Sequence, residues 1–189
     1  TMPNGVDAIR RPTKLELKEF RTHFEIAEDD EVYGFVGRLG KEKNLEVLID
    51  TIEKVIAARP KARLLFVGDF EYRATLEALA ADSGFSHRIT FTGALERDDL
   101  GVAYAAMSVF VFPSLKDTQG WVLHEAAHAG LPIVLIDQKV SMVVRDGENG
   151  FFVENDSDDI ADKVINLLAD DEQRLQMGQR SKKIAQTLT

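Results

Sequence analysis

Short apolar runs alternate with longer amphipathic segments along most of the chain. Segments between the runs, such as 44–59 and 71–83, carry apolar residues at helical spacing, which predicts helices. The runs themselves are of strand length and rich in branched and aromatic residues. Six of them are expected to be strands: Val32–Val36, Leu64–Val67, Ile89–Thr92, Val109–Phe112, Ile133–Ile136 and Phe151–Val153.

Several of these runs are apolar throughout, which is typical of parallel strands buried on both faces of a sheet. Right-handed connections between them predict an α/β fold, a Rossmann-like doubly wound parallel sheet of about six strands with helices on both faces. We expect residues 1–189 to form a single domain, ending in one or two surface helices after residue 157. In such a fold the ligand lies at the carboxyl ends of the strands, where loops 37–44, 68–71, 93–98 and 113–120 should converge.

Composition narrows the range of functions. The chain has 189 residues, 44% of them hydrophobic and 29% charged, with a net charge of −9 and no cysteine. The acidic balance argues against a general nucleic-acid binder, because such proteins neutralise phosphates with clustered Lys and Arg. The lack of cysteine excludes disulfides and thiolate metal sites. No apolar run approaches the ~20 residues that span a bilayer.

Candidate chemistry begins in the turn after the first strand, Gly37-Arg-Leu-Gly-Lys-Glu-Lys-Asn44. Arg38 and Lys43 could grip a diphosphate there, Arg by its planar fork and Lys as a point charge. Solvated surface charges are the alternative interpretation, and the position at a strand's carboxyl end favours ligand binding. Neither a dinucleotide fingerprint nor a P-loop motif is present.

The segment from Pro113 to Pro132 contains a second candidate site. A polar loop follows a strand, and Gly120 then opens an alanine-rich helix whose amino end would attract an anion. Asp117 in the loop and Glu125 one turn into the helix bracket this position. Together they suit a ligand that combines phosphate with a polyhydroxylated sugar.

The helix after Gly120 sorts into two faces at 100° per residue. Val122, Leu123, Ala126, Ala127 and Ala129 are expected to pack on the sheet, and Trp121, His124, Glu125 and His128 share the opposite arc.

That arc also spells His124-Glu-Ala-Ala-His128, which matches the zinc metalloprotease pattern H-E-x-x-H. Glu148 lies at a spacing where a third ligand could fall, but within the turn Asp146-Gly-Glu-Asn-Gly150 rather than on a rigid helix. We therefore expect no metal and treat the two histidines as ordinary residues of a polar face.

These motifs together resemble the carboxyl-terminal lobe of the two-lobed (GT-B) retaining glycosyltransferases of group 1, which are family-four-like enzymes. The resemblance covers nearly the whole chain. It rests on a series of motifs in order along the chain, with the Asp117 and Glu125 pair falling on the family's Glu–seven–Glu signature. The other matching segments are 3–7, 36–44, 66–69, 91–95 and 146–153.

The resemblance implies a role for each candidate residue. Arg38, Lys43, Gly120, Trp121 and Val122 would bind the diphosphate. The donor sugar would lie against Asp117, Thr118, Gln119 and Gly120, the ribose against Glu125, and the base against Ala94 and Leu95. Asp117 and Glu125 are the candidate catalytic pair, and neither is expected to be a nucleophile.

The implied function is that of a hexosyltransferase. Its donor would be a nucleoside diphosphate sugar such as a UDP or GDP sugar, used without a cofactor or obligatory metal. The acceptor, a sugar, glycolipid or small molecule, would bind through an amino-terminal lobe that is absent here, so we expect the isolated chain to be inactive. A cytoplasmic location follows, compatible with peripheral association at the inner membrane face. The alternatives are a nucleotide-sugar-binding protein or epimerase of the same architecture and the zinc metalloprotease.

The sequence also departs from the family pattern. Asp117 stands where the family usually has a Glu, His124 and His128 replace residues that are usually apolar or small, and Met142 replaces a frequent Glu. The form Asp117-Thr-Gln-Gly120 resembles relatives that glycosylate lipids.

Overall fold

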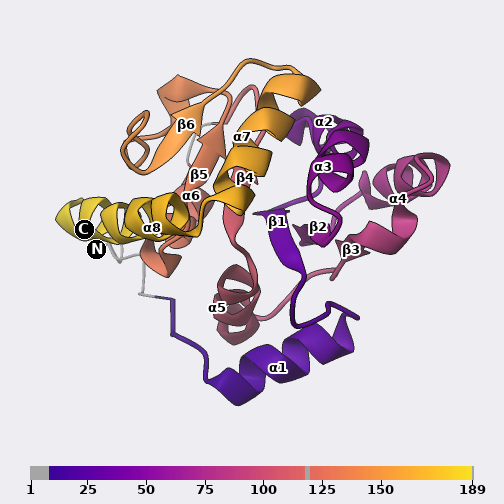
Figure 1. Cartoon of the computed structure of the whole chain (residues 1–189), viewed down its shortest axis with the longest axis horizontal. Coiled ribbons are helices and arrows are strands. Elements are labelled where there is room, and N and C mark those ends of the chain that lie inside the picture. The colour runs from indigo at the N-terminus through magenta and orange to yellow at the C-terminus, as the bar shows by residue number, and fades with distance from the viewer. Residues whose placement is uncertain (1–8, 118–119, 189) are drawn as a thin grey trace.

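A computed structural model describes residues 9–117 and 120–188 of the chain. Its centre is a six-stranded, entirely parallel sheet with the strand order β3-β2-β1-β4-β5-β6 (Figure 1). All six predicted strands are confirmed, with their ends shifted by at most two residues. They are β1 (Glu31–Val36), β2 (Ala62–Val67), β3 (Ile89–Phe91), β4 (Val109–Phe112), β5 (Ile133–Leu135) and β6 (Gly150–Phe152).

Helices cover both faces of this sheet, which confirms the predicted doubly wound fold (Figure 1). On one side α7 packs against α2 and α3, and on the other α5 and α8 both pack against α6. The helices are α1 (Lys14–His23), α2 (Glu46–Asp50), α3 (Ile52–Ala58), α4 (Arg73–Asp82), α5 (Arg97–Ala106), α6 (Trp121–Ala129), α7 (Ser157–Ala169) and α8 (Asp171–Thr187). Short 3-10 turns occupy Lys41–Lys43, Ser86–Arg88 and Gln138–Val140.

The helices differ from the predictions in two places. The segment 44–59 forms two helices instead of one, because the Thr51 hydroxyl bonds back to the carbonyl of Leu48 at 2.6 Å and disturbs the helical ladder. Helix α1 was not predicted, although Thr13 and Glu16 form a capping box at its start. The helices expected after residue 157 are present as α7 and α8, and the apolar face of α7 packs against β4 and β5.

The position of the ligand site follows from the strand order. The chain runs outward from β1 to β2 and β3, and then returns to place β4 on the other side of β1. At such a switch point the loops that follow the two central strands diverge and leave a crevice. The crevice here opens between the turn after β1 and the loop after β4.

Two glycines bring the backbone close together at the base of this crevice. Gly68, just after β2, has φ +131°, and a Cβ there would lie 1.9 Å from the carbonyl oxygen of Gly37. Only glycine combines that φ with so close a contact. The loops after β1 and β2 are therefore packed directly against each other.

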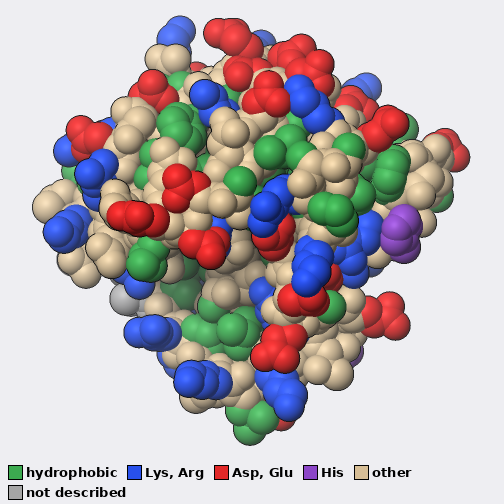
Figure 2. Space-filling view, in the orientation of Figure 1, with side chains coloured by type: hydrophobic (Ala, Val, Ile, Leu, Met, Phe, Trp, Pro, Cys, Tyr) green, Lys and Arg blue, Asp and Glu red, His purple; other side chains and the backbone are tan. Residues whose placement is uncertain are grey.

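The surface carries mixed charge. Figure 2 shows acidic and basic side chains interspersed over the visible face, with acidic side chains gathered near its upper edge. Within residues 9–117 and 120–188, no helix has the length and apolar character needed to cross a membrane.

Candidate functional site

Two adjoining hollows lie at the carboxyl ends of the central strands. The first, which we call the Lys43–Asp117 hollow, has a volume of about 230 Å3. The second, the Glu125 hollow, has a volume of about 340 Å3 and extends toward the loops after β2 and β3. Both are lined by Gly37, Arg38 and Val122, so they form one continuous cleft.

The first hollow is named for an ion pair that crosses it. Lys43 Nζ lies 2.5 Å from Asp117 Oδ2, and the side chains are only 15% and 13% exposed. The two residues come from opposite sides of the crevice, after β1 and after β4. Limited exposure strengthens their attraction relative to a pair at the surface. The ion pair thus joins Lys43, which was predicted to bind the diphosphate, to Asp117, which was predicted to bind the donor sugar.

Asn44 holds the two sides of this hollow in register. Its backbone is left-handed, with φ 56°, at the end of the 3-10 turn. Its side-chain Nδ2 donates to the carbonyl of Pro113 at 3.1 Å and to Oδ1 of Asn155 at 2.9 Å. The turn after β1 is therefore tied to the loop after β4. Sequence reasoning assigned Asn44 no role, although the tolerance of Asn for this conformation was a usable signal.

Arg38 lies where the two hollows meet and is more exposed than Lys43. Its side chain is 57% exposed, with its guanidinium 2.7 Å from Glu42. The guanidinium also lies over the ring of Phe70, 4.6 Å from the centroid. A guanidinium stacked on an aromatic face keeps its remaining edge available for an anion.

Glu125 lines the second hollow from helix α6. Its Oε2 accepts a hydrogen bond from the Tyr104 hydroxyl at 2.8 Å, and Tyr104 is fully buried on α5. Burial, and then the charge of Glu125, raise the pKa of Tyr104 well above its ordinary value. The tyrosine is therefore a permanent neutral donor to this carboxylate. Sequence reasoning missed Tyr104, which carries no local signal that distinguishes it from a core residue.

The other predicted site residues are divided between the two hollows. Ala94 and Leu95 line the Glu125 hollow, and Trp121 lines the Lys43–Asp117 hollow. Val122 is half-buried, packs against the hydrophobic core as expected, and also lines both hollows.

The amino end of α6 faces this cleft. Gly120 precedes the helix, and no side chain from the described ranges caps it. Thr118 and Gln119, predicted to contact the donor sugar, lie outside the described residues, as does the segment 3–7.

The two histidines of α6 are more enclosed than expected for a polar face. His124 Nδ1 and His128 Nε2 are buried without a hydrogen-bond partner in the described structure. Burial, and then the proximity of His128, lower the pKa of His124. Each residue as a whole is half-buried, because helix α5 packs against α6. Among the described residues no three His, Cys, Asp or Glu side chains gather as a metal site would require.

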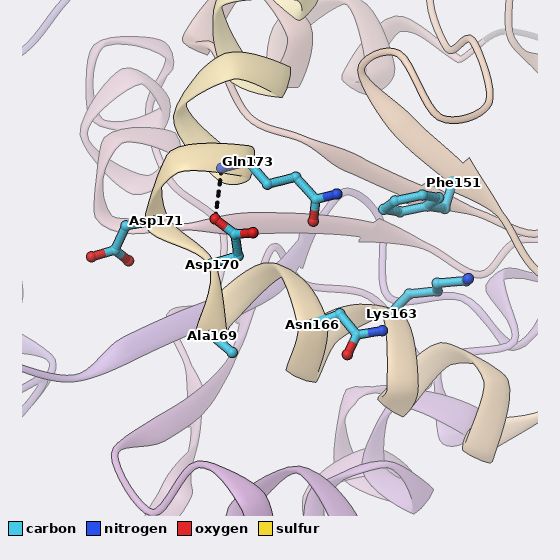
Figure 3. Close-up of a pocket in the computed structure, with 7 residues that line it drawn as sticks. All are labelled: Phe151, Lys163, Asn166, Ala169, Asp170, Asp171 and Gln173. Atoms are coloured by element: carbon cyan, nitrogen blue, oxygen red, sulfur yellow. Dashed lines mark hydrogen bonds between the residues drawn. The ribbon is translucent and has the colours of Figure 1, made fainter.

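A larger hollow of about 620 Å3 lies away from the cleft, at the junction of α7 and α8 (Figure 3). Asp170 there accepts from the backbone N–H of Gln173 at 2.9 Å and so caps α8. Lys163 lies over the ring of Phe151, with Nζ 4.9 Å from the centroid. In a doubly wound sheet the carboxyl end of such a helix lies toward the amino ends of the strands. We therefore place the functional site in the cleft, not here.

Comparison with known proteins agrees with this geometry. The family model described as "Glycosyl transferases group 1" matches residues 17–184. The chain is 34% identical over 184 residues to sulfoquinovosyl transferase SQD2 of Arabidopsis thaliana, covering 94% of this chain and 34% of that protein. It is 30% identical over 187 residues to a GDP-mannose-dependent alpha-(1-6)-phosphatidylinositol monomannoside mannosyltransferase of Mycobacterium tuberculosis, covering 94% of this chain and 48% of that protein.

A solved structure shares the fold. Alr3699/HepE of Anabaena in complex with UDP superposes with a TM-score of 0.83 at 22% identity, covering 94% of this chain and 49% of that one. The chain thus spans about half or less of the length of these relatives.

Proposed function

The chain belongs to the group 1 glycosyl transferases, and from that premise we propose that it forms the donor-binding part of a hexosyltransferase. The reaction moves a sugar from a nucleoside diphosphate sugar to an acceptor hydroxyl, with the anomeric configuration retained. The observation that carries this proposal is the cleft itself. It places two cations, Arg38 and Lys43, between an acid suited to a sugar and an acid suited to a ribose.

The Lys43–Asp117 hollow suits the reacting end of the donor. When the bond between the anomeric carbon and the phosphate oxygen breaks, the electron pair leaves with the diphosphate. Lys43, Arg38 and the amino end of α6 would stabilise that negative charge. Asp117 would accept hydrogen bonds from the sugar hydroxyls and so orient the sugar.

The Glu125 hollow suits the nucleoside. Ionised Glu125 can accept from a ribose hydroxyl, while Ala94 and Leu95 offer apolar surface to a base. The Anabaena neighbour was solved in complex with UDP, and the name of the mycobacterial relative includes GDP-mannose. Both donor classes therefore remain in the proposal.

The acceptor is proposed to be a sugar, a glycolipid or another small alcohol. A lipid acceptor is supported by the mycobacterial relative, whose name specifies a phosphatidylinositol monomannoside. The acceptor would bind against a second lobe of the enzyme, and the reaction would take place in the cytoplasm or at the inner membrane face. The 189-residue chain alone is expected to bind nucleoside diphosphates without turning a donor over.

No metal is needed in this proposal, because Arg38 and Lys43 serve as the counter-ions of the diphosphate. We expect chelator dialysis to leave nucleotide affinity unchanged. Zinc retained stoichiometrically after dialysis, and lost in His124→Ala, would show instead that the α6 histidines hold a metal.

Titration calorimetry with UDP, GDP and ADP tests the proposal directly. We expect Glu125→Gln to weaken binding of the preferred nucleoside diphosphate by ~1.5–3 kcal/mol, the scale of a hydrogen bond to a charged group. The 2′-deoxy analogue should lose less, since one partner is already missing. Equal losses for both ligands in this double cycle would show that Glu125 does not contact the ribose.

Turnover separates a transferase from a binding protein or an epimerase. Reconstituted with its remaining lobe, the enzyme should release diphosphate only when an acceptor alcohol is added. Conversion of the donor without any acceptor would contradict the transferase proposal.

A further inference from the structure

Tyr104 lies behind the cleft, beneath the carboxylate of Glu125. It is fully buried on α5, with its ring centroid 5.9 Å from that of Phe110 on β4. Its hydroxyl is 2.8 Å from Glu125 Oε2 and 3.5 Å from the carbonyl oxygen of Val122. A buried tyrosine ring needs a partner for its hydroxyl, and here that partner is a residue that lines the cleft.

Only one of the two Glu125 oxygens is engaged in this way. Among the described residues, no donor forms a hydrogen bond with Oε1. Glu125 itself is half-buried and borders the Glu125 hollow. The carboxylate therefore has one oxygen fixed by the protein core and one that remains available to a ligand.

Such an anchor changes what the carboxylate can do. A glutamate on a helix has three rotatable side-chain bonds, and ordering it on binding reduces affinity. A bond from a rigid, buried donor places the carboxylate before the ligand arrives, and no charge is introduced that would compete with a ligand. The Lys43–Asp117 pair provides the contrast, because there the partner is itself a cation.

We propose that Tyr104 is a positioning residue for the nucleotide, whose hydroxyl holds Oε2 of Glu125 so that Oε1 accepts from a ribose hydroxyl. The inference rests on the proposed function and adds to it a source of selectivity for ribonucleotides. Tyr104 acts through Glu125 and is not expected to touch the ligand.

The central experiment compares Tyr104→Phe with the wild-type chain by calorimetry, using UDP, GDP or ADP, whichever binds most tightly, and its 2′,3′-dideoxy analogue. The substitution keeps the ring and removes only the hydroxyl. We expect affinity for the ribonucleotide to fall about fivefold to tenfold, which is the scale of one intramolecular hydrogen bond. Affinity for the dideoxy analogue should hardly change. In a Glu125→Gln background, Tyr104→Phe should have little further effect.

Tyr33→Phe is the matched control. Tyr33 is also fully buried, its hydroxyl pairs with Thr51 at 2.9 Å, and neither residue lines the cleft. Losing this hydroxyl should lower the melting temperature but leave the ratio of ribo to dideoxy affinity at its wild-type value. A purely structural role for Tyr104 would give the same pattern as Tyr33, and that result would overturn the inference.

Glu125→Asp tests the same bond from its other side and does not depend on how well Tyr104→Phe folds. Shortening the side chain by one methylene keeps the charge and withdraws it from Tyr104, so a ribose-selective loss is again expected. A wild-type ratio in Glu125→Asp would contradict the inference.

If the wild-type chain binds no nucleoside diphosphate, the proposed function itself fails. If it binds them and distinguishes ribose, but Tyr104→Phe does not alter that distinction, only the role of Tyr104 is wrong.

Discussion

The two hollows of the cleft hold their acidic residues in different ways. Asp117 is neutralised by Lys43 at 2.5 Å, so its charge is already satisfied before any ligand enters. Glu125 instead accepts from the neutral hydroxyl of Tyr104 at 2.8 Å and keeps its full charge. One hollow therefore contains a closed ion pair, and the other contains an anchored, unneutralised carboxylate.

This difference suits the two ends of a nucleotide sugar. A diphosphate that enters the first hollow competes with Asp117 for Lys43, and the released carboxylate then becomes an acceptor for sugar hydroxyls. Binding in the first hollow therefore requires the Lys43–Asp117 pair to separate, whereas the Glu125 carboxylate is already positioned for a ribose. Preorganisation should therefore be greater at the nucleoside end than at the diphosphate end.

The largest effect is expected for a substitution of Gly68, because its backbone packs against Gly37. Gly68→Ala would place a Cβ 1.9 Å from the Gly37 carbonyl oxygen at φ +131°. We expect unfolding free energy to fall by roughly 2–5 kcal/mol from backbone strain and overpacking. Both ends of the nucleotide should bind more weakly in calorimetry, because Gly37 lines both hollows.

Gly84→Ala is the control for Gly68→Ala. Gly84 also has a positive φ of +79°, but no atom lies within 4 Å of a Cβ built there. It should lose only the ~1–2 kcal/mol of left-handed strain and retain normal nucleotide binding. If the two variants behave alike, the contact between Gly37 and Gly68 has no special importance for the cleft.

The next effect concerns the ion pair. We expect Lys43→Ala to weaken nucleoside diphosphate binding by ~1.5–3 kcal/mol, since it removes a charge-assisted bond. It also leaves Asp117, whose side chain is 13% exposed, as an unpaired negative charge beside the phosphates. Lys43→Ala with Asp117→Asn should therefore bind the diphosphate more tightly than Lys43→Ala alone. A double variant that binds no better would show that the charge of Asp117 does not oppose diphosphate binding. Binding of the plain nucleoside should be unaffected in both variants.

The fold followed from sequence because its signals are local. Apolar runs of strand length define β1 to β6, and the glycines flanking 121–129 define α6. The loops of the cleft were then located by topology alone, so Arg38, Lys43 and Glu125 could be named in advance.

Sequence reasoning missed the contacts that hold those residues in place. Tyr104 reaches Glu125 across 21 positions of the chain, and Asn44 reaches the carbonyl of Pro113 across 69. Neither contact leaves a periodic or compositional signal, because each depends on how α5 packs on α6 and how the crevice closes. The same packing leaves His124 half-buried, although the helical pattern placed it on the polar face of α6.

The smallest effect is expected for Arg38, which differs from Lys43 in exposure. Its side chain is 57% exposed, against 15% for Lys43, and it is already held by Glu42 and the Phe70 ring. Charge interactions at such a surface are weakened by water and salt, so Arg38→Ala should reduce diphosphate affinity by only ~0.5–1 kcal/mol. The loss should shrink further in high salt, whereas that of Lys43→Ala should persist. Lys41→Ala, an exposed cation of the same turn that lines neither hollow, is the matched control and should leave binding unchanged. Arg38→Ala could instead lose as much diphosphate affinity as Lys43→Ala, and in an equally salt-resistant way. That result would mean that Arg38 leaves Phe70 and becomes buried against the diphosphate. The first hollow would then rearrange more extensively than separation of the ion pair requires.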